Sequence, residues 1–558
     1  MRSSRVEHLT AYMISTGILL VLSLPLFLSI VSLARDHTAW AVWSETSRIG
    51  RLLTNTLGLA IGAILVSLPA GTLLALLLER GRVTGVKSLR QFLTLALFIP
   101  LPVYAVAWQI VLGSWLPAPA LAPGEVAWRP WRQGLLPAAV VHGLAAIPWV
   151  VWIVSAIFSR TDSSLEDAAR IEGGWGTMIR RVLLPRAVFA AMFAGMWVAG
   201  QAATEIPITD AMMVRTLAED VYTEMVGNPA GVHAAIALGL PIWLLSSVLA
   251  IAAFHVLQNR FPPASESNDV IAGSKRTNRL LTVLAWLSTG IVAGIPFLAL
   301  INRAGSNHGN FQFPALFKTV STQLRDSGGV VAESLLAAVF AGTITALLSW
   351  VVCSTLGRTM RGFSLLVAFA VSLWLVPGPI VGFGLKELIF VLLDGEDAVC
   401  RMLGATPTFP PLRSLLYDQP TPIPAIIAST IRFFPLAVAL ILPAIRAVPA
   451  ELWDLARLDG LGLVALFRRI LIPLTGHAVF RAGVAVAVLS LGEVSASKLV
   501  NPPSQRAYIL DLFNQMHYGA EATVAGLCLV QVAMTAIVLA VGFGLIRGPS
   551  GRPSSMAR

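Results

Sequence analysis

Long apolar runs constrain this chain more than any other feature of its sequence. Twelve stretches of mostly apolar residues occur along it, and each reaches the length of about 20 residues that a helix needs to cross a bilayer. Hydrophobic residues make up 56% of the 558 residues and charged residues only 12%, whereas soluble chains carry about 25% charged residues. This composition excludes an ordinary soluble enzyme and a disordered chain. The spans must be helices, because open strands would leave unpaired backbone groups in lipid.

The predicted spans fall into two sets of six. The first set is 11–33, 53–78, 91–115, 135–158, 187–209 and 234–256, and the second is 279–301, 330–356, 363–393, 422–445, 474–497 and 521–546. We therefore predict an all-α polytopic membrane protein of about 12 transmembrane helices. Its first six-span half is 1–257, a cytoplasmic linker rich in Pro, Ser and Asn is 258–278, and the second half is 279–558.

Lys and Arg indicate the orientation in the membrane. They are more numerous in the loops on the same side of the membrane as the N-terminus than in the loops on the opposite side. Because cytoplasmic loops collect these residues, we expect both termini to be cytoplasmic. The excess of Lys and Arg in cytoplasmic loops also explains the net charge of +11. We therefore expect no nucleic-acid partner.

The two sets of spans share sequence features at matching places. Residues 167–173 read DAARIEG, and residues 454–460 read DLARLDG at an offset of 287. VLLP, ending at Pro185, follows the first copy and ILIP, ending at Pro473, follows the second, and Glu205 and Glu493 follow those prolines at equal distance. Self-similarity at a fixed offset indicates internal duplication. We predict two parallel six-helix repeats.

The loops that carry this repeated motif are predicted to form short helices outside the lipid. Gly173 and Gly460 are placed to end them, as glycine does past a helix C-terminus. Each helix has small residues beside an arginine: Ala168, Ala169 and Arg170 in the first, Ala456 and Arg457 in the second. A short helix with a small-residue face suits docking into a groove on another protein.

This pair of loops resembles the EAA motif of the permease subunits of ABC importers, with Asp167 and Asp454 in place of the motif's glutamate. The resemblance implies a fold like that of type I importer permeases and a bacterial inner-membrane location. It also implies two separate ATP-binding-cassette ATPase subunits and an extracytoplasmic solute-binding protein as partners. By this resemblance, the residues that couple to the ATPases, none of them catalytic, are Asp167, Ala168, Ala169, Arg170, Gly173, Asp454, Ala456, Arg457 and Gly460.

The chain has no G-x-x-x-x-G-K-[ST] phosphate loop, whose backbone amides and lysine hold ATP in such proteins. We therefore expect no enzyme activity and no cofactor in this chain, with ATP hydrolysed on the partner subunits. The fused twelve-span form resembles the ferric-iron type of permease. Permeases for thiamine, polyamines and phosphonates share much of this framework, so they remain alternatives.

Two carboxylates mark a candidate substrate path. Glu205 and Glu493 lie near the outer ends of two predicted spans, and an ionisable residue in a span is a functional hypothesis by default. Carboxylates suit hard cations. The alternative is that each caps a helix end or forms a salt bridge, for example Glu493 with Lys498. Arg432 lies within another span, and the identity of any metal-binding residue stays open.

A secondary transporter of the major-facilitator kind is the alternative of another class. It too has twelve spans in parallel halves. Its usual mark is G-x-x-x-D-R-x-G-R-[RK] between the second and third spans, and residues 79–82 here read ERGR without the leading glycine and the aspartate. A proton-driven carrier has no need for the two coupling-type loops, so these loops discriminate between the classes.

Overall fold

The computed structural model describes residues 2–115, 131, 133–158, 163–227, 231–258, 275–307, 310–404, 411–459, 461–518 and 522–546. Across these residues ten helical segments are long and apolar enough to cross a membrane, or twelve if two bent pairs each count as one span. The predicted all-α polytopic membrane architecture is thus confirmed. The spans contain α1 (Arg2–Arg35), α2 (Thr46–Arg80), α5 (Leu135–Phe158), α7 (Leu184–Thr204), α10 (Val232–Gln258), α11 (Lys275–Thr289) with α12 (Ile295–Ala304), α13 (Phe313–Leu356), α17 (Ile423–Arg446), α20 (Ile472–Ser490) and α23 (Ala522–Ile546).

Two predicted continuous spans are broken. In place of 91–115 the chain forms α3 (Val86–Leu97) and α4 (Leu101–Trp115), bent by 102°, and in place of 363–393 it forms α14 (Met360–Trp374) and α15 (Gly378–Met402), bent by 99°. A Pro-x-Pro triplet lies at each break, at 100–102 and 377–379. Proline has no N–H to donate and its ring clashes with the preceding turn, so two closely spaced prolines end a helix.

Prolines also set the wide π-helical turns inside three spans. The turns are η2 (Ile179–Leu183), η4 (Gly290–Gly294) and η6 (Phe467–Leu471), and each ends two residues before a proline. A π-turn widens the backbone where the proline ring would otherwise clash with the carbonyl four residues earlier. The turns η2 and η6 lie just before the matched prolines Pro185 and Pro473, so the same local structure recurs where the sequence features recur.

Packing does not follow the two sequence halves. One hydrophobic core joins α2, α5 and α7 to α12 and α23, and the other joins α13, α17 and α20 to α1 and α10. Two helices of each sequence half therefore pack in the core that the other half mainly forms. Within the cores, small residues allow close approach: a Cβ on Gly342 of α13 would overlap the carbonyl oxygen of Gly483 on α20.

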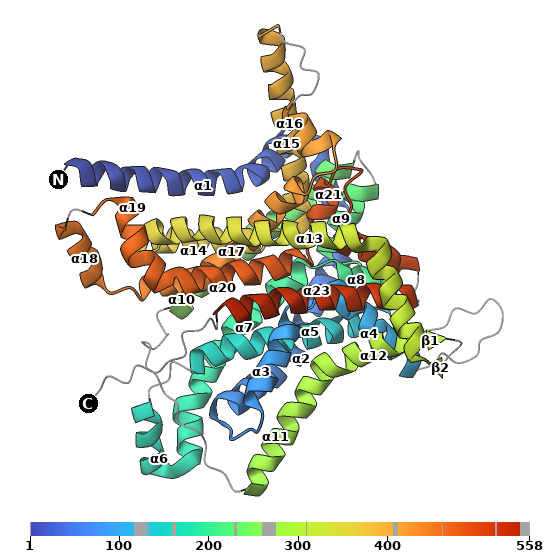
Figure 1. The fold of residues 1–558 in the computed structure, drawn as a ribbon, viewed down its shortest axis with the longest axis vertical. Coiled ribbons are helices and arrows are strands. Elements are labelled where there is room, and N and C mark those ends of the chain that lie inside the picture. Colours follow the sequence, from blue (N-terminus) through green and yellow to red (C-terminus); the bar gives the residue numbers. More distant parts are fainter. Residues whose placement is uncertain are drawn as a thin grey trace.

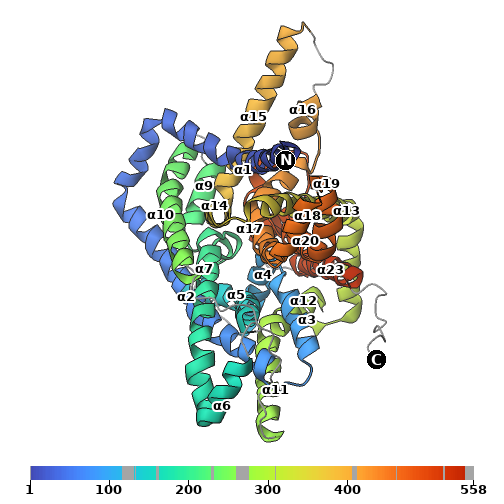
Figure 2. The same cartoon turned by 90° about the vertical axis from the view of Figure 1, so that its left-hand side faces the viewer.

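The ends of the bundle differ in what they carry. Figures 1 and 2 show α6 (Ser163–Met178) and α18 (Ala450–Leu458), together with the starts of α1 and α11, toward one end. The opposite end carries the short helices α8 (Pro207–Ala211), α9 (Leu217–Gly227), α21 (Ser497–Val500) and α22 (Tyr508–Gln515), and the two-residue strands β1 (Ser306–Asn307) and β2 (Asn310–Phe311). We call these the loop-helix end and the outer end.

Candidate functional site

The first motif loop forms a short helix that ends at its glycines. Within α6 the backbone leaves the helical conformation at Gly173 and at Gly174, where φ is +70°. Only glycine adopts such a φ at low cost. Asp167 and Arg170 form an ion pair at 3.4 Å along the helix, and Ala168 is exposed. The sequence therefore correctly located both the helix and its end.

The second motif loop forms α18, and the structure describes part of its predicted site. Asp454 is exposed and Ala456 is buried. The side chain of Arg457 and the whole of Gly460 lie outside the described residues. Both loop helices lie at the same end of the bundle (Figure 1), which places the two motif copies on one face of the molecule.

The expected small-residue docking face is turned inward. Ala169 and Ala456 are only 7% and 5% exposed, and Ala169 packs with Met178 and Leu183 beneath α6. A small side chain is what lets the loop helix lie close against the bundle. Of the small residues predicted in the first helix, Ala168 stays exposed. The other exposed apolar residues of the two helices are Leu165 and Ile171 in α6 and Leu455 and Leu458 in α18.

Each loop helix is fastened to the end of a neighbouring span. In α6 the fully buried Glu166 accepts hydrogen bonds from Arg80, at 2.9 Å from Nη2, and the same nitrogen donates to the Phe158 carbonyl at 2.9 Å. In α18 the residue at the matching place is Trp453, and the guanidinium of Arg358 stacks 3.5 Å above its ring. An ion pair in one half thus corresponds to a cation–π contact in the other.

Sequence reasoning missed these anchors, although signals were present. Glu166 directly precedes the DAARIEG motif, and Arg80 closes the apolar run of α2. A charge at the end of a span, beside a motif helix on the same side of the membrane, is a reasonable pairing candidate. Nothing in the sequence shows that Trp453 takes the same place in the second half.

A cavity of about 110 Å³ lies between the two halves and is lined by both predicted path carboxylates. Glu205 ends α7, Glu493 follows α20, and Arg432 of α17 lines the same space. Arg432 donates to the Val376 carbonyl at 2.9 Å, at the α14–α15 break. The sequence-predicted pair is thus brought together, with a cation that the sequence left unassigned.

The two carboxylates differ in how they are held. Glu493 is 6% exposed and accepts hydrogen bonds from the backbone N–H groups of Ala496 and Ser497, at 2.9 and 2.8 Å. It therefore caps α21, which is one of the alternatives that the sequence left open. Lys498 does not pair with it, because its ammonium lies over the rings of Phe513 and Tyr222. Glu205 also lines the cavity, and its carboxyl group has a backbone hydrogen bond from the adjacent Ile206.

Stacked tryptophans close one side of this cavity. Trp197 of α7 stacks on Trp374 of α14 with ring centroids 3.9 Å apart, and Trp149 of α5 lies 4.9 Å from Trp197. Trp149 and Trp374 line the cavity. Among the described residues no group of three or more His, Cys, Asp or Glu side chains could hold a metal ion.

At the outer end, a polar and aromatic cluster joins the two halves. Asp210 of α8 pairs with His517 at 2.7 Å, in the short helix η7 (Met516–Tyr518). Tyr222 meets Phe513 edge-on, and the Lys498 ammonium lies 4.6 Å from the Phe513 ring. The hydrogen bond to Asp210 raises the pKa of His517 above its usual value. The ion pair thus links α8 of the first half to η7 of the second.

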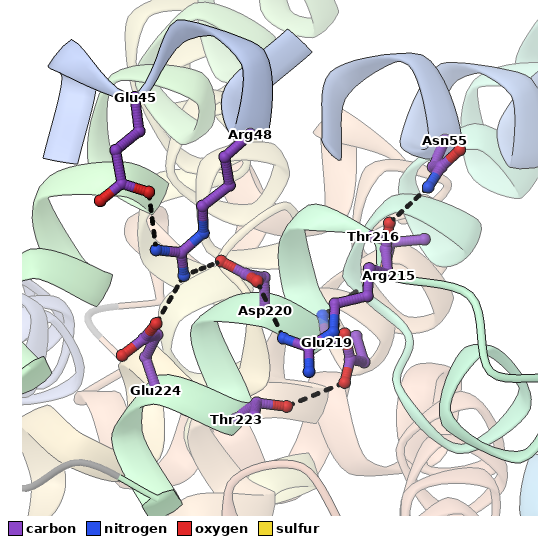
Figure 3. Close-up of polar contacts among 9 residues, drawn as sticks. All are labelled: Glu45, Arg48, Asn55, Arg215, Thr216, Glu219, Asp220, Thr223 and Glu224. Carbon is purple, nitrogen blue, oxygen red and sulfur yellow. Dashed lines mark hydrogen bonds and ion pairs between the residues drawn. The ribbon is translucent and has the colours of Figure 1, made fainter. Parts of the chain in front are cut away.

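A second charged network fastens α9 to the start of α2, as Figure 3 shows. Arg48 binds Asp220 at 2.7 Å, Glu224 at 2.5 Å and Glu45 at 3.3 Å. Arg215 approaches the second oxygen of Asp220 at 3.4 Å. One acidic side chain of α9 is thus shared between two arginines from different elements.

The same network borders an outer pocket of about 550 Å³. The described residues that line it include three arginines and one carboxylate. They are Arg48, Arg51, Arg215 and Asp220. Beside it, burial raises the pKa of Glu219, whose Oε1 accepts a hydrogen bond from Thr223 at 2.8 Å. The pocket therefore presents net positive charge at the outer end.

No protein-family model matches this chain, and neither does any curated protein. The residues and their geometry therefore carry the functional argument.

Proposed function

We propose that the chain is the transmembrane permease subunit of an ATP-binding-cassette importer of the type I kind, built from two parallel six-span repeats. The observation that carries this proposal is the pair of loop helices α6 and α18. They lie at one end of the bundle, carry the two copies of one motif, and are each fastened to a neighbouring span. Such an anchor would transmit a push on the loop helix to the spans.

The repeated features support the duplicated architecture. The Pro-x-Pro breaks at 100–102 and 377–379 and the π-turns η2 and η6 occur in the same order along each half. The central cavity lies where the two halves meet, which is where a path shared by two repeats would run.

The proposed location is a bacterial cytoplasmic membrane with both termini inside, and the proposed partners are two ATPase subunits at the loop-helix end. A solute-binding protein would dock at the outer end. The arginine-lined pocket there would accept acidic side chains of that protein by charge complementarity.

The proposed cargo is ferric iron, with Glu205 and Glu493 facing the passing cation. Thiamine, polyamines and phosphonates are the alternatives within the same class, and the cavity's mixture of two carboxylates and Arg432 is compatible with more than one of them. A proton-driven carrier of the major-facilitator kind is the alternative of another class.

The first experiment is purification of the tagged chain in mild detergents, followed by mass spectrometry of what accompanies it. We expect a P-loop ATPase at about two copies per chain, because there are two loop helices for it to bind. A chain that emerges alone from several mild detergents would instead favour the proton-driven carrier.

Variants of the outward loop faces sharpen this experiment. Ala168→Arg and Leu458→Arg place a charge on the exposed surface of α6 and α18 and should abolish ATPase co-purification while the chain still reaches the membrane. Ala168→Ser is the matched control and should retain the ATPase. Gly173→Trp is less suitable, because a Cβ there already overlaps the Thr177 side chain.

The cargo is tested separately. In vesicles that hold the chain with its ATPase and binding protein, uptake of ferric iron, thiamine, a polyamine and a phosphonate is compared. Glu205→Gln should reduce cation uptake without loss of the bound ATPase. Equal uptake by Glu205→Gln and the unchanged chain would remove this carboxylate from the path.

A further inference from the structure

The last 18 residues of α15 form an arm that projects from the bundle. The first part of α15, from Gly378 to Gly384, is largely buried. In the part that follows, one side still packs on the second core through Leu385, Ile389 and Leu393, and Figures 1 and 2 show its far end extending past the neighbouring helices. In Figure 1 the arm runs nearly at right angles to α1, α13, α17 and α20. We define the distal arm as residues 385–402.

We propose that the distal arm lies on the outer surface of the bilayer, with one apolar stripe inserted among the lipids. This inference depends on the spans lying in a membrane and does not depend on the transport function proposed above.

The depth at which α15 leaves the bundle supports this proposal. It crosses α1 at Gly384, where a Cβ would overlap the Pro25 carbonyl and lie 2.6 Å from Ser29 Oγ. Both residues belong to the apolar span Thr10–Arg35. With a rise of 1.5 Å per residue, Ser29 lies about 9 Å from the end of that span at Arg35. The arm therefore emerges near the outer end of that span, within reach of the membrane interface.

One face of the arm is apolar. Leu388, Val391, Leu392, Val399 and Met402 follow the spacing i, i+3, i+4, i+11 and i+14, which places them on one side of a helix. Leu388, nearest the bundle, packs partly against the second core, and the stripe is uncovered beyond it. Val391, Val399 and Met402 are 52%, 54% and 85% exposed. Gly395 occupies the i+7 place and adds no polar group to the stripe.

The rest of the arm's circumference is occupied or polar. The Glu396 carboxylate accepts hydrogen bonds from the backbone N–H groups of Leu412 and Arg413 at 2.8 and 3.0 Å, and Asp397 pairs with Arg413 at 3.0 Å. These contacts hold α16 (Pro411–Arg413) along one side. Asp394 and Arg401 are exposed, and their spacing of seven residues places them together on another side of the helix. The apolar stripe is the side that neither group covers.

The charges of the arm indicate how it would bind lipid. Glu387, Asp394, Glu396 and Asp397 outnumber Lys386 and Arg401, so attraction to anionic headgroups is not available. Binding must come from apolar burial, as in an interfacial amphipathic helix, and should therefore persist at high salt. Phe390, which packs against Tyr417 at 5.5 Å, lies on the side of the arm opposite the stripe and takes no part in this binding.

The test places an environment-sensitive fluorophore at single cysteines in the full-length chain, reconstituted in zwitterionic phosphatidylcholine vesicles. The background carries Cys353→Ala, Cys400→Ala and Cys528→Ala. Val391→Cys and Val399→Cys report on the apolar stripe, and Asp394→Cys and Arg401→Cys are matched controls on the polar side of the same helix. Because all four positions are exposed, labelling should not disturb the core, and a single symmetric size-exclusion peak checks this.

We expect probes at positions 391 and 399 to emit at shorter wavelength and to be quenched several-fold more by shallow spin-labelled lipids than probes at 394 and 401. Aqueous iodide should quench in the reverse order, with and without added salt. Equal iodide quenching at all four positions would overturn the proposal. So would shielding of positions 391 and 399 that occurs only when a purified protein partner is added, since that outcome assigns the stripe to a protein.

Discussion

At the residue scale, the buried pair of Arg80 and Glu166 fixes the position of the first loop helix. Both side chains are almost fully buried, at 1% and 0% exposure. Removing one partner from such a pair leaves an uncompensated buried charge, at a cost of about 3–5 kcal/mol. The pair therefore links the local structure of α6 to the end of α2 more strongly than an exposed ion pair could.

We expect Glu166→Leu to destabilise the chain by about 3–5 kcal/mol and to expose α6 to protease. The double variant Arg80→Met with Glu166→Leu removes both charges and should recover most of the lost stability. Thermal unfolding in detergent, together with limited proteolysis of the loop, measures both effects. A double variant no more stable than Glu166→Leu would show that packing, and not the ion pair, positions the helix.

The ion pair between Asp210 and His517 makes the outer contact between the halves depend on pH. Because the pKa of His517 is raised by Asp210, protonated His517 stabilises the folded state. This contribution is complete below the unfolded pKa of about 6.5 and is lost as the pH rises through the higher folded value.

Asp210→Asn should therefore lower the melting temperature more at about pH 6 than at about pH 9. Melting curves of the unchanged chain and the variant in one detergent, at both pH values, measure the difference. His517→Gln is the companion variant and should abolish the same pH-dependent increment. A pH-independent loss in Asp210→Asn would mean that the hydrogen bond matters and the charge of His517 does not.

At the element scale, close helix contacts depend on glycines that the sequence does not distinguish from others. In α13, Gly342 approaches the backbone of α20 at Gly483, whereas a Cβ on Gly328 or Gly329 of the same helix meets open space. Gly342 lies within an apolar run and Gly328 and Gly329 lie just before it, but only the packing of α13 against α20 shows which of them a neighbouring backbone approaches.

Gly342→Leu should push α13 and α20 apart and destabilise the bundle, by at least the 1–3 kcal/mol typical of overpacked cores. Gly329→Leu is the matched control in the same helix and should be tolerated, since it replaces a glycine with a better helix former. Thermal unfolding in detergent compares the two variants. Similar melting temperatures would contradict the close approach.

At the scale of the whole molecule, the two cores share helices across the sequence halves. Because α1 and α10 pack with the second core, and α12 and α23 with the first, neither sequence half contains a complete core. The linker predicted at 258–278 connects two sequence halves that are not two packing units.

We expect the fragment 1–257, expressed alone, to aggregate or be degraded, since α1 and α10 would lack their partners. Co-expression with the fragment 279–558 should restore a complex in which a tag on one fragment retrieves the other. The measurement is tag pull-down followed by size exclusion in detergent. Two fragments that are each stable and monodisperse alone would contradict the exchange of helices between cores.

The sequence by itself determined the all-α polytopic membrane architecture, ten of the twelve predicted spans and the helices of the motif loops. Apolar runs of spanning length admit only helices in lipid, and the glycines at the end of DAARIEG stop α6 where expected. Even the two breaks could be located, because Pro-x-Pro triplets cannot continue a helix. These features are local, and local chemistry decides them. The six-span repeat and its coupling role remain predictions.

Only the tertiary structure decided which residues meet. It turned Ala169 and Ala456 inward, paired Arg80 with Glu166 and Arg358 with Trp453, and brought Glu205, Arg432 and Glu493 to one cavity. It also sent the end of α15 sideways out of the bundle, where a continuous span was expected. Apolar patterning sets how much of a helix is buried, whereas contacts between residues hundreds of positions apart depend on how the helices cross and pack.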